Sequence, residues 1–185
     1  MKVLIIPEDP TLDRFILKPV VEKIFAEFGK SPWIEVLSNP RLRGVAQALD
    51  SAILARIVAA RPMIDLFLVL IDQDGDARRA AVAGQREVEH QGRLFVCLAI
   101  EEIEVWMLAI HRRDLNLSWS QIRSEVHPKE RIAEPFLEEK ALKLNRGAAR
   151  AWAMQGLGAR WKGVIRCCPE LKELQQRVER WLAER

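Results

Sequence analysis

The feature that most constrains the fold is a nearly unbroken apolar run, IDLFLVLI, at residues 64–71. Asp65 is its single polar residue. The run falls far short of the roughly 20 apolar residues that cross a bilayer as a helix. It also lacks the alternation of a strand with one wet face. Continuous apolar character over so few residues is typical of a central strand buried on both faces of a parallel sheet.

Three more apolar segments of strand type, rich in β-branched and aromatic residues, lie with this run within the first 100 residues. They occupy residues 3–6, 33–37 and 94–100. Helical spacing of apolar residues follows each strand, at residues 11–28, 44–60, 77–90 and 101–111. The regular alternation predicts an α/β fold, a four-stranded parallel sheet with helices on both faces.

The strand pattern ends near residue 115, and short helical pieces broken by proline and glycine follow. A final helix is predicted over 170–184, where one apolar stripe contains Leu171, Leu174, Val178, Trp181 and Leu182. We therefore expect an α/β core over residues 1–115 and a helical extension over 116–185 that packs on it.

Composition indicates the class of protein and its cellular compartment more clearly than its function. Of 185 residues, 49% are hydrophobic and 30% charged, with a net charge of +3, which is ordinary for a globular protein and does not by itself indicate nucleic-acid binding. The N-terminal apolar run is too short for a signal peptide, and no segment is long enough to span a membrane. Three cysteines, two of them adjacent, form neither a disulfide framework nor a zinc site. We expect a cytoplasmic protein with reduced thiols, and the sequence indicates no oligomeric state.

Acidic residues follow three of the four predicted strands. They are Glu8 after the first, Asp72, Asp74 and Asp76 after the third, and Glu101, Glu102 and Glu104 after the fourth. The carboxyl ends of parallel strands meet at one rim, where ligands bind. Clustered carboxylates repel one another unless a cation lies between them, and Mg²⁺ or Mn²⁺ prefers such oxygen ligands. We predict a metal site formed by Asp72 and Asp74 with Glu101 and Glu104, which share a face of the expected helix while Glu102 points elsewhere.

Simpler interpretations exist for these acids. Asp76 fits a cap of the helix that follows, and Glu8, Glu101 and Glu104 suit the positive end of a helix dipole. An EF-hand is excluded, because its glycine and glutamate positions are occupied by Ala77 and Ala83. No P-loop, nucleophile elbow or paired-histidine motif is present.

Three segments together resemble the Toprim domain, most closely the OLD-family nucleases and their small stand-alone relatives. They are IIPEDPT at 5–11, LIDQDGD at 70–76 and AIEEIEVWML at 99–108, within a resemblance that covers residues 1–112. It implies a Rossmann-like sheet, Glu8 as the catalytic glutamate, and Asp72 and Asp74 as the metal pair completed by Glu101 and Glu104. The usual Glu-Gly of the first motif is replaced by Glu8-Asp9-Pro10, which changes this loop. Lys129 lies where these relatives often carry a lysine, which can stabilise phosphoryl charge.

A stretch without any acidic residue runs from Ala141 to Cys168. Its cations and those beside the acidic rim are candidate nucleic-acid contacts, and they are Lys143, Arg146, Arg150, Arg160 and Lys162 together with Arg78 and Arg79. Trp152 and Trp161 are interleaved among them and could stack on bases. The alternative is that the tryptophans anchor the extension and the cations are merely solvated.

Together these features predict a nuclease that depends on Mg²⁺ or Mn²⁺ and acts on nucleic acid. Glu8 would bind a second ion or act as general acid or base. OLD-family proteins carry an ATPase domain that this sequence lacks, so the resemblance implies a separately encoded ATPase partner. Two alternatives are a non-catalytic module that binds nucleic acid or protein, and a phosphatase-like enzyme for small nucleotides.

Overall fold

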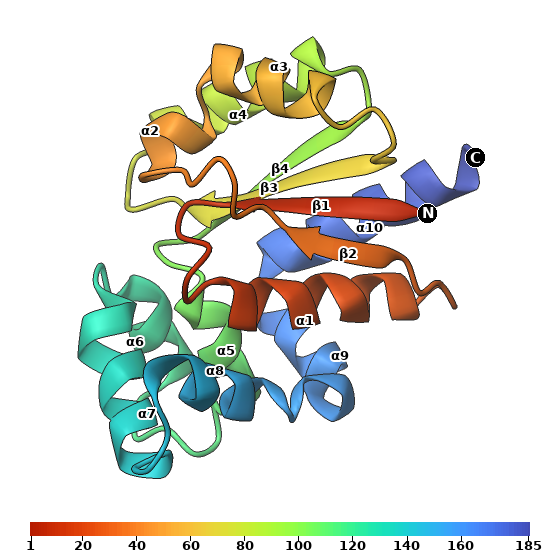
Figure 1. The fold of residues 1–185 in the computed structure, drawn as a ribbon. Coiled ribbons are helices and arrows are strands. Elements are labelled where there is room, and N and C mark those ends of the chain that lie inside the picture. The colour runs from red at the N-terminus through yellow and green to blue at the C-terminus, as the bar shows by residue number, and fades with distance from the viewer.

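The computed structural model describes residues 1–185 and contains one parallel sheet with strand order β2-β1-β3-β4 (Figure 1). The strands are β1 (Lys2–Pro7), β2 (Trp33–Val36), β3 (Leu66–Asp72) and β4 (Leu94–Ala99). All four predicted strands are confirmed, with ends shifted by at most two residues. Every residue of β3 before Asp72 is buried, as expected of a strand covered on both faces.

Helices cover the two faces of the sheet in two layers (Figure 1). One layer consists of α2 (Val45–Ala48), α3 (Ser51–Ala59) and α4 (Arg78–Glu89), whereas the other contains α1 (Arg14–Ala26) and α5 (Glu104–Ile110). Alternate strand residues point to opposite faces of the sheet. Val3 and Ile5 belong to a core of 37 buried residues on the α1 side, and Leu4 and Ile6 belong to a core of 15 buried residues on the other side.

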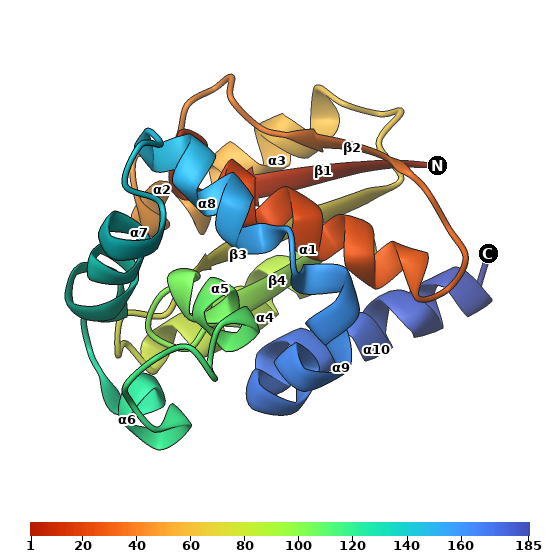
Figure 2. The same ribbon diagram turned by 90° about the horizontal axis from the view of Figure 1, so that it is seen from below.

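The C-terminal third is the predicted helical extension. It comprises α6 (Trp119–Ser124), the π-helix η1 (Lys129–Ala133), α7 (Glu134–Lys140), α8 (Arg146–Met154), α9 (Leu157–Cys167) and α10 (Pro169–Ala183). Helices α8, α9 and α10 lie on the α1 side of the sheet, as the view from below shows (Figure 2). Their buried residues, including Ala153, Trp161 and Leu174, belong to the same 37-residue core as α1 and α5. No helix of the chain has both the length and the apolar character needed to cross a membrane.

Two predicted helices have different bounds, each for a local reason. The helix expected over 44–60 is divided into α2 and α3, because Asp50 has extended backbone angles and its side chain accepts a hydrogen bond from the Ile53 N–H at 2.8 Å. The helix expected from Glu101 begins only at Glu104, because Glu101 has a φ of +62°, which no right-handed helix accommodates.

The chain reverses its direction across the sheet between β1 and β3. From β1 it passes through α1 to β2 on one side, and it then returns by α2 and α3 on the opposite face to β3 on the other side of β1. In such sheets, the crevice outside the carboxyl ends of the two central strands is the usual ligand site. Glu8 follows β1 directly and Asp72 ends β3, so both acids lie at this switch point.

Candidate metal centre

Three carboxylates meet at the rim of the sheet. Asp72, Asp74 and Glu102 each offer an oxygen, and these oxygens lie within 4.8 Å of one another. Asp72 is the last residue of β3, Asp74 follows two residues later, and Glu102 comes from the loop after β4. An all-oxygen donor set of this kind suits Mg²⁺ or Mn²⁺ rather than a softer ion.

The backbone brings these three side chains together by locking two loops to each other. The N–H groups of Gln73 and Asp74 both donate to the carbonyl oxygen of Glu101, each at 3.1 Å. Asp74, Gly75 and Glu101 have positive φ angles of 45°, 65° and 62°. Left-handed geometry is sterically costly for the aspartate and the glutamate, so these turns are maintained by the loop pairing.

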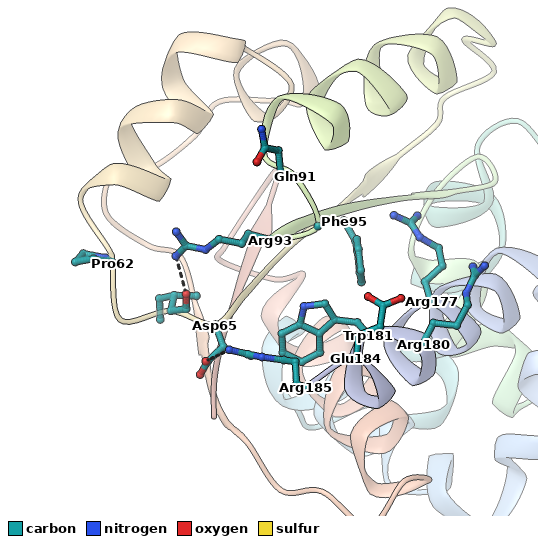
Figure 3. A pocket seen from close by; sticks show the side chains of 12 residues that line it. Pro62, Asp65, Gln91, Arg93, Phe95, Arg177, Arg180, Trp181, Glu184 and Arg185 are labelled. Atoms are coloured by element: carbon teal, nitrogen blue, oxygen red, sulfur yellow. Dashed lines mark hydrogen bonds and ion pairs between the residues drawn. The ribbon is translucent and has the colours of Figure 1, made fainter.

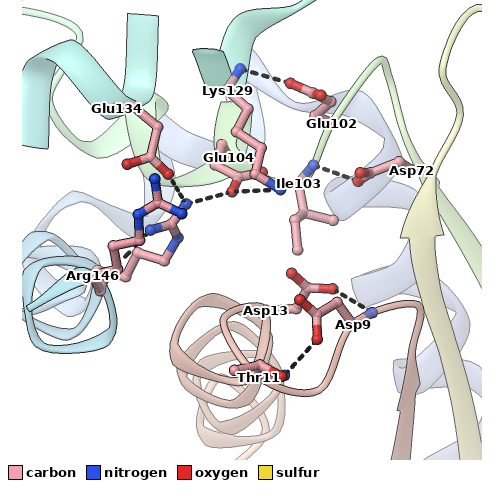
Figure 4. A network of polar contacts seen from close by, with 11 residues as sticks. Asp9, Thr11, Asp13, Asp72, Glu102, Ile103, Glu104, Lys129, Glu134 and Arg146 are labelled. Atoms are coloured by element: carbon pink, nitrogen blue, oxygen red, sulfur yellow. Dashed lines mark hydrogen bonds and ion pairs between the residues drawn. The ribbon is translucent and has the colours of Figure 1, made fainter. Parts of the chain in front are cut away.

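Each of the three carboxylates has one oxygen fixed by a hydrogen bond. Asp72 Oδ1 accepts from the Ile103 N–H at 2.8 Å, and Glu102 Oε2 accepts from the Lys129 N–H at 2.6 Å (Figure 4). Asp74 Oδ2 accepts from Arg79 at 2.7 Å. The carboxylates are therefore positioned before any ligand binds, which reduces the ordering cost of binding.

More acids surround this group, and their charges are not fully balanced. Burial, followed by the nearby Glu104 and Glu8, raises the pKa of Asp72 to about 9. Burial is also the main cause that raises the pKa of Asp13 and that of Glu102, each to about 7. Burial and then Asp74 raise the pKa of Glu8. Shifts in this direction mean that burial, with help from neighbouring acids, disfavours the charged form of these groups, and a bound cation would favour that form again.

Unpartnered polar atoms point to the same conclusion. The Oε2 atoms of Glu8, Glu101 and Glu104 are buried and make no hydrogen bond within the protein. Glu104 is 1% exposed, so bulk water does not satisfy its free oxygen. Buried polar atoms without partners are rare in folded proteins, and an ion is one of their ordinary explanations. The residues present therefore fit a divalent cation.

Two cations of the extension reach the acidic rim. Lys129 Nζ lies 3.8 Å from Glu104 Oε1 (Figure 4). Burial alone would lower the pKa of Lys129, but Glu104, Asp13 and Asp72 together outweigh it and raise the pKa, so the ammonium stays charged. On the far side of Glu104, Arg150 donates from one nitrogen to Glu104 Oε1 at 3.0 Å and to Glu134 Oε1 at 2.6 Å.

The structure changes the membership of the predicted metal set. Glu102 was expected to point away, which is wrong, because the helix on which that expectation rested begins after it. Glu101 lies at the edge of the group, where its Oε2 approaches the turn at Gly75. Glu104 is buried beside the group and is bound to Arg150. Asp13, which sequence reasoning missed, is buried and accepts a hydrogen bond from the Asp9 N–H at 3.0 Å.

The predicted basic surface is only partly exposed. Arg150 was predicted to bind nucleic acid, which is wrong, because its side chain is completely buried between two glutamates. The remaining predicted contacts of the stretch are exposed, namely Lys143, Arg146, Arg160 and Lys162, and so is Arg166. At the rim, Arg78 is exposed and pairs with Asp76, whereas half-buried Arg79 pairs with Asp74. Asp76 was expected to cap α4, but the N-cap residue is Ala77, and Asp76 lies one residue earlier, where it accepts from the Arg78 N–H at 3.0 Å.

The two tryptophans of this stretch anchor the extension. Trp161 is buried and donates from Nε1 to Gln175 on α10 at 2.8 Å. Trp152 stacks on His111 with ring centroids 5.7 Å apart. The expectation that Trp161 stacks on bases is therefore wrong, because no face of its ring is accessible.

Comparisons with known proteins do not assign the chain to a family, so a functional proposal rests on the site itself. No family model matches the chain, and neither the curated proteins nor the solved structures contain a match to it.

Proposed function

We propose that the chain is a phosphodiester-cleaving enzyme of Toprim type, a nuclease that requires Mg²⁺ or Mn²⁺ and acts in the cytoplasm. The observation that carries this proposal is the convergence of Asp72, Asp74 and Glu102 within 4.8 Å, at the switch point of the sheet, with buried acids around them. When bound, a divalent ion would lower the pKa of a water molecule and neutralise charge on phosphoryl oxygens.

The surrounding residues have separate roles in this proposal. Asp72, Asp74 and Glu102 hold the ion, and Glu104 keeps one unpartnered oxygen that can complete the set. Glu8 has a free buried oxygen, and burial raises its pKa, a direction that favours a role as general acid or base. Lys129 can pair with a non-bridging phosphate oxygen, since its ammonium is charged and lies beside Glu104.

A nucleic-acid substrate is supported by the exposed cations close to this rim. Arg41 lies 3.6 Å from Asp9 in the loop that follows Glu8, and Arg78 begins α4 directly after the acidic turn. Exposed guanidinium groups beside a metal site can bind the phosphates on either side of a scissile bond. A separately encoded ATPase, implied by the resemblance to OLD-family proteins, is proposed as the partner.

The direct test is a cleavage assay with single-stranded DNA, duplex DNA and RNA, in Mn²⁺, Mg²⁺ or EDTA. We expect metal-dependent cleavage of at least one polymer and a loss of about 100-fold or more in Asp74→Asn, because a ligand of the ion is removed. Asp76→Asn is the matched control, since this half-buried carboxylate lies two residues away and outside the group. Cleavage that persists in EDTA, or hydrolysis of free nucleotides alone, would contradict the nuclease proposal.

A non-catalytic binding module is the second candidate. It is favoured by one observation: Glu8 is followed by Asp9 and Pro10, and Asp9 accepts a hydrogen bond from the Thr11 N–H at 2.9 Å. This turn differs from the glycine turn that the resemblance leads one to expect. Binding of nucleic acid without cleavage, unchanged in Asp74→Asn, would favour this candidate.

A further inference from the structure

A second site lies at the opposite end of the sheet from the acidic rim. A cleft of about 670 Å³ is formed by the loop before β3, the start of β4 and the last turns of α10 (Figure 3). Six residues of β3, from Leu66 to Ile71, separate Asp65 of the cleft from Asp72. At a rise of roughly 3.3 Å per residue, the two sites are about 20 Å apart. A ligand in this cleft therefore does not touch the proposed metal centre.

The cleft is lined mainly by polar groups, and arginines dominate its charge. Four guanidinium groups face it, those of Arg93, Arg177, Arg180 and Arg185, against the two carboxylates of Asp65 and Glu184. They come from sequence positions up to 92 residues apart, so folding brings them together. Like charges brought to one concave surface repel one another and favour an anionic ligand.

Two of these arginines are already engaged. Arg177 pairs with Glu87 at 2.6 Å and lies over the Phe95 ring, 4.5 Å from its centroid. Arg185 pairs with Asp65 at 2.7 Å and lies over the Trp181 ring at 4.6 Å. Stacking and pairing fix these two guanidinium planes, so they form rigid walls.

The other two arginines have no carboxylate partner. Arg93 donates to the Ile64 carbonyl oxygen at 2.9 Å and lies over the Phe67 ring, 5.7 Å from its centroid. The guanidinium group of Arg180 makes no hydrogen bond or ion pair within the chain (Figure 3). Both side chains belong to exposed residues. Guanidinium groups present several donors in a planar fork that matches phosphate oxygens, and two of them suit a ligand with more than one negative charge.

We propose that this cleft binds a small ligand that carries two or more phosphate groups, with Arg93 and Arg180 as its principal contacts. The volume lies in the range of small-molecule sites, and the lining comes from three parts of the chain, namely the loop before β3, the start of β4 and α10. Glu184, the lining carboxylate without an ion-pair partner, opposes the ligand's charge and limits its affinity. This proposal is independent of the metal centre and of the cleavage reaction.

The test is calorimetric titration of the full chain with pyrophosphate and with ADP, in low salt with EDTA so that no metal-bridged binding occurs at the acidic rim. We expect saturable binding of both ligands. The double variant Arg93→Gln/Arg180→Gln should weaken it by about tenfold or more, since each lost guanidinium removes a charge-assisted hydrogen bond. Glu184→Gln should strengthen binding severalfold, an effect that a purely structural role would not produce.

Arg166→Gln is the matched control, because Arg166 is exposed, makes no ion pair, and lies on α9, 11 positions before Arg177, the first residue of α10 that lines the cleft. Binding should be unchanged in this variant. Absence of saturable binding by the wild-type chain would overturn the proposal, as would an equal loss in Arg166→Gln. A third arm uses a short single-stranded oligonucleotide: if it binds through Arg93 and Arg180 while pyrophosphate and ADP do not, the cleft is a nucleic-acid contact and the proposal is wrong.

Discussion

Exchange of Asp72 for asparagine is expected to make the metal-free protein more stable and, at the same time, to remove its response to metal. Burial raises the pKa of Asp72 from 3.8 to about 9, and the neighbouring carboxyl groups of Glu104 and Glu8 add to this shift. A carboxyl group whose pKa is raised on folding makes stability fall as pH rises through the window from about 4 to about 9, because the unfolded chain releases the proton more readily.

The neutral asparagine does not incur this cost and keeps an oxygen for the Ile103 N–H. At pH 8 in EDTA we expect Asp72→Asn to be more stable by about 1–3 kcal/mol, less than the full linkage value because the neighbouring acids share the titration. The gain should shrink towards pH 4.5, where Asp72 of the wild type is protonated. Denaturant unfolding at both pH values measures it.

Addition of Mn²⁺ should then stabilise the wild type and leave Asp72→Asn unchanged, since binding to the native state alone stabilises it. Asp76→Asn provides the control of opposite sign. Hydrogen bonds from Arg78 lower the pKa of Asp76 to about 2, so its removal should bring no gain in stability at pH 8. A wild type that is more stable than Asp72→Asn at pH 8 without metal would contradict the raised pKa of Asp72.

Replacement of Arg150 by methionine is expected to produce the largest loss of stability. The Arg150 side chain is 0% exposed and bridges Glu104, itself 1% exposed, to Glu134. Removal of one partner from a buried ion pair leaves an uncompensated charge and typically costs about 3–5 kcal/mol. For a chain of this length the melting temperature should fall by roughly 6–20 °C.

Arg146→Met is the matched control, one helical turn earlier on α8. The Arg146 side chain is exposed. Arg150 donates a hydrogen bond to the backbone carbonyl oxygen of Arg146, which the substitution keeps. We expect a change within about 0.5 kcal/mol, as for most surface substitutions. Adding Glu104→Gln to Arg150→Met should restore part of the lost stability, because the unpaired carboxylate is removed. Equal destabilisation by Arg146→Met and Arg150→Met would contradict a large contribution of the buried Arg150 ion pairs to stability.

The strands and the position of the acidic rim could be predicted because their signals are local. A continuous apolar run such as residues 66–71 fits a central parallel strand and little else, and an acid directly after such a strand must lie at its carboxyl end. Asp72, Asp74 and Glu8 were found in this way.

The remaining members of the site depend on backbone geometry and distant partners. Glu102 joins the group because Glu101 is left-handed and delays the start of α5, and nothing in the sequence marks a positive φ at a glutamate. Asp13 precedes α1 like an ordinary helix-capping residue, and only the fold shows that it is buried. Arg150 belongs to a basic stretch by sequence, yet its partner Glu104 lies 46 residues away.

The arginine cleft could not be predicted at all, since Arg93 precedes a strand and Arg180 belongs to the polar stripe of a terminal helix. Neither arginine has a sequence neighbourhood that marks a binding site. Both line one cleft because α10 returns along the sheet to the amino ends of β3 and β4.

The central claim is tested most directly by calorimetric titration of the wild type with Mn²⁺ and Mg²⁺ beside Asp74→Asn, Glu102→Gln and the control Asp76→Asn. We predict saturable binding by the wild type and by Asp76→Asn, with affinity reduced by about 100-fold or more in the other two variants, because each removes a ligand of the ion. Absence of saturable binding up to millimolar metal, or equal binding by all four proteins, would contradict a metal centre at this rim.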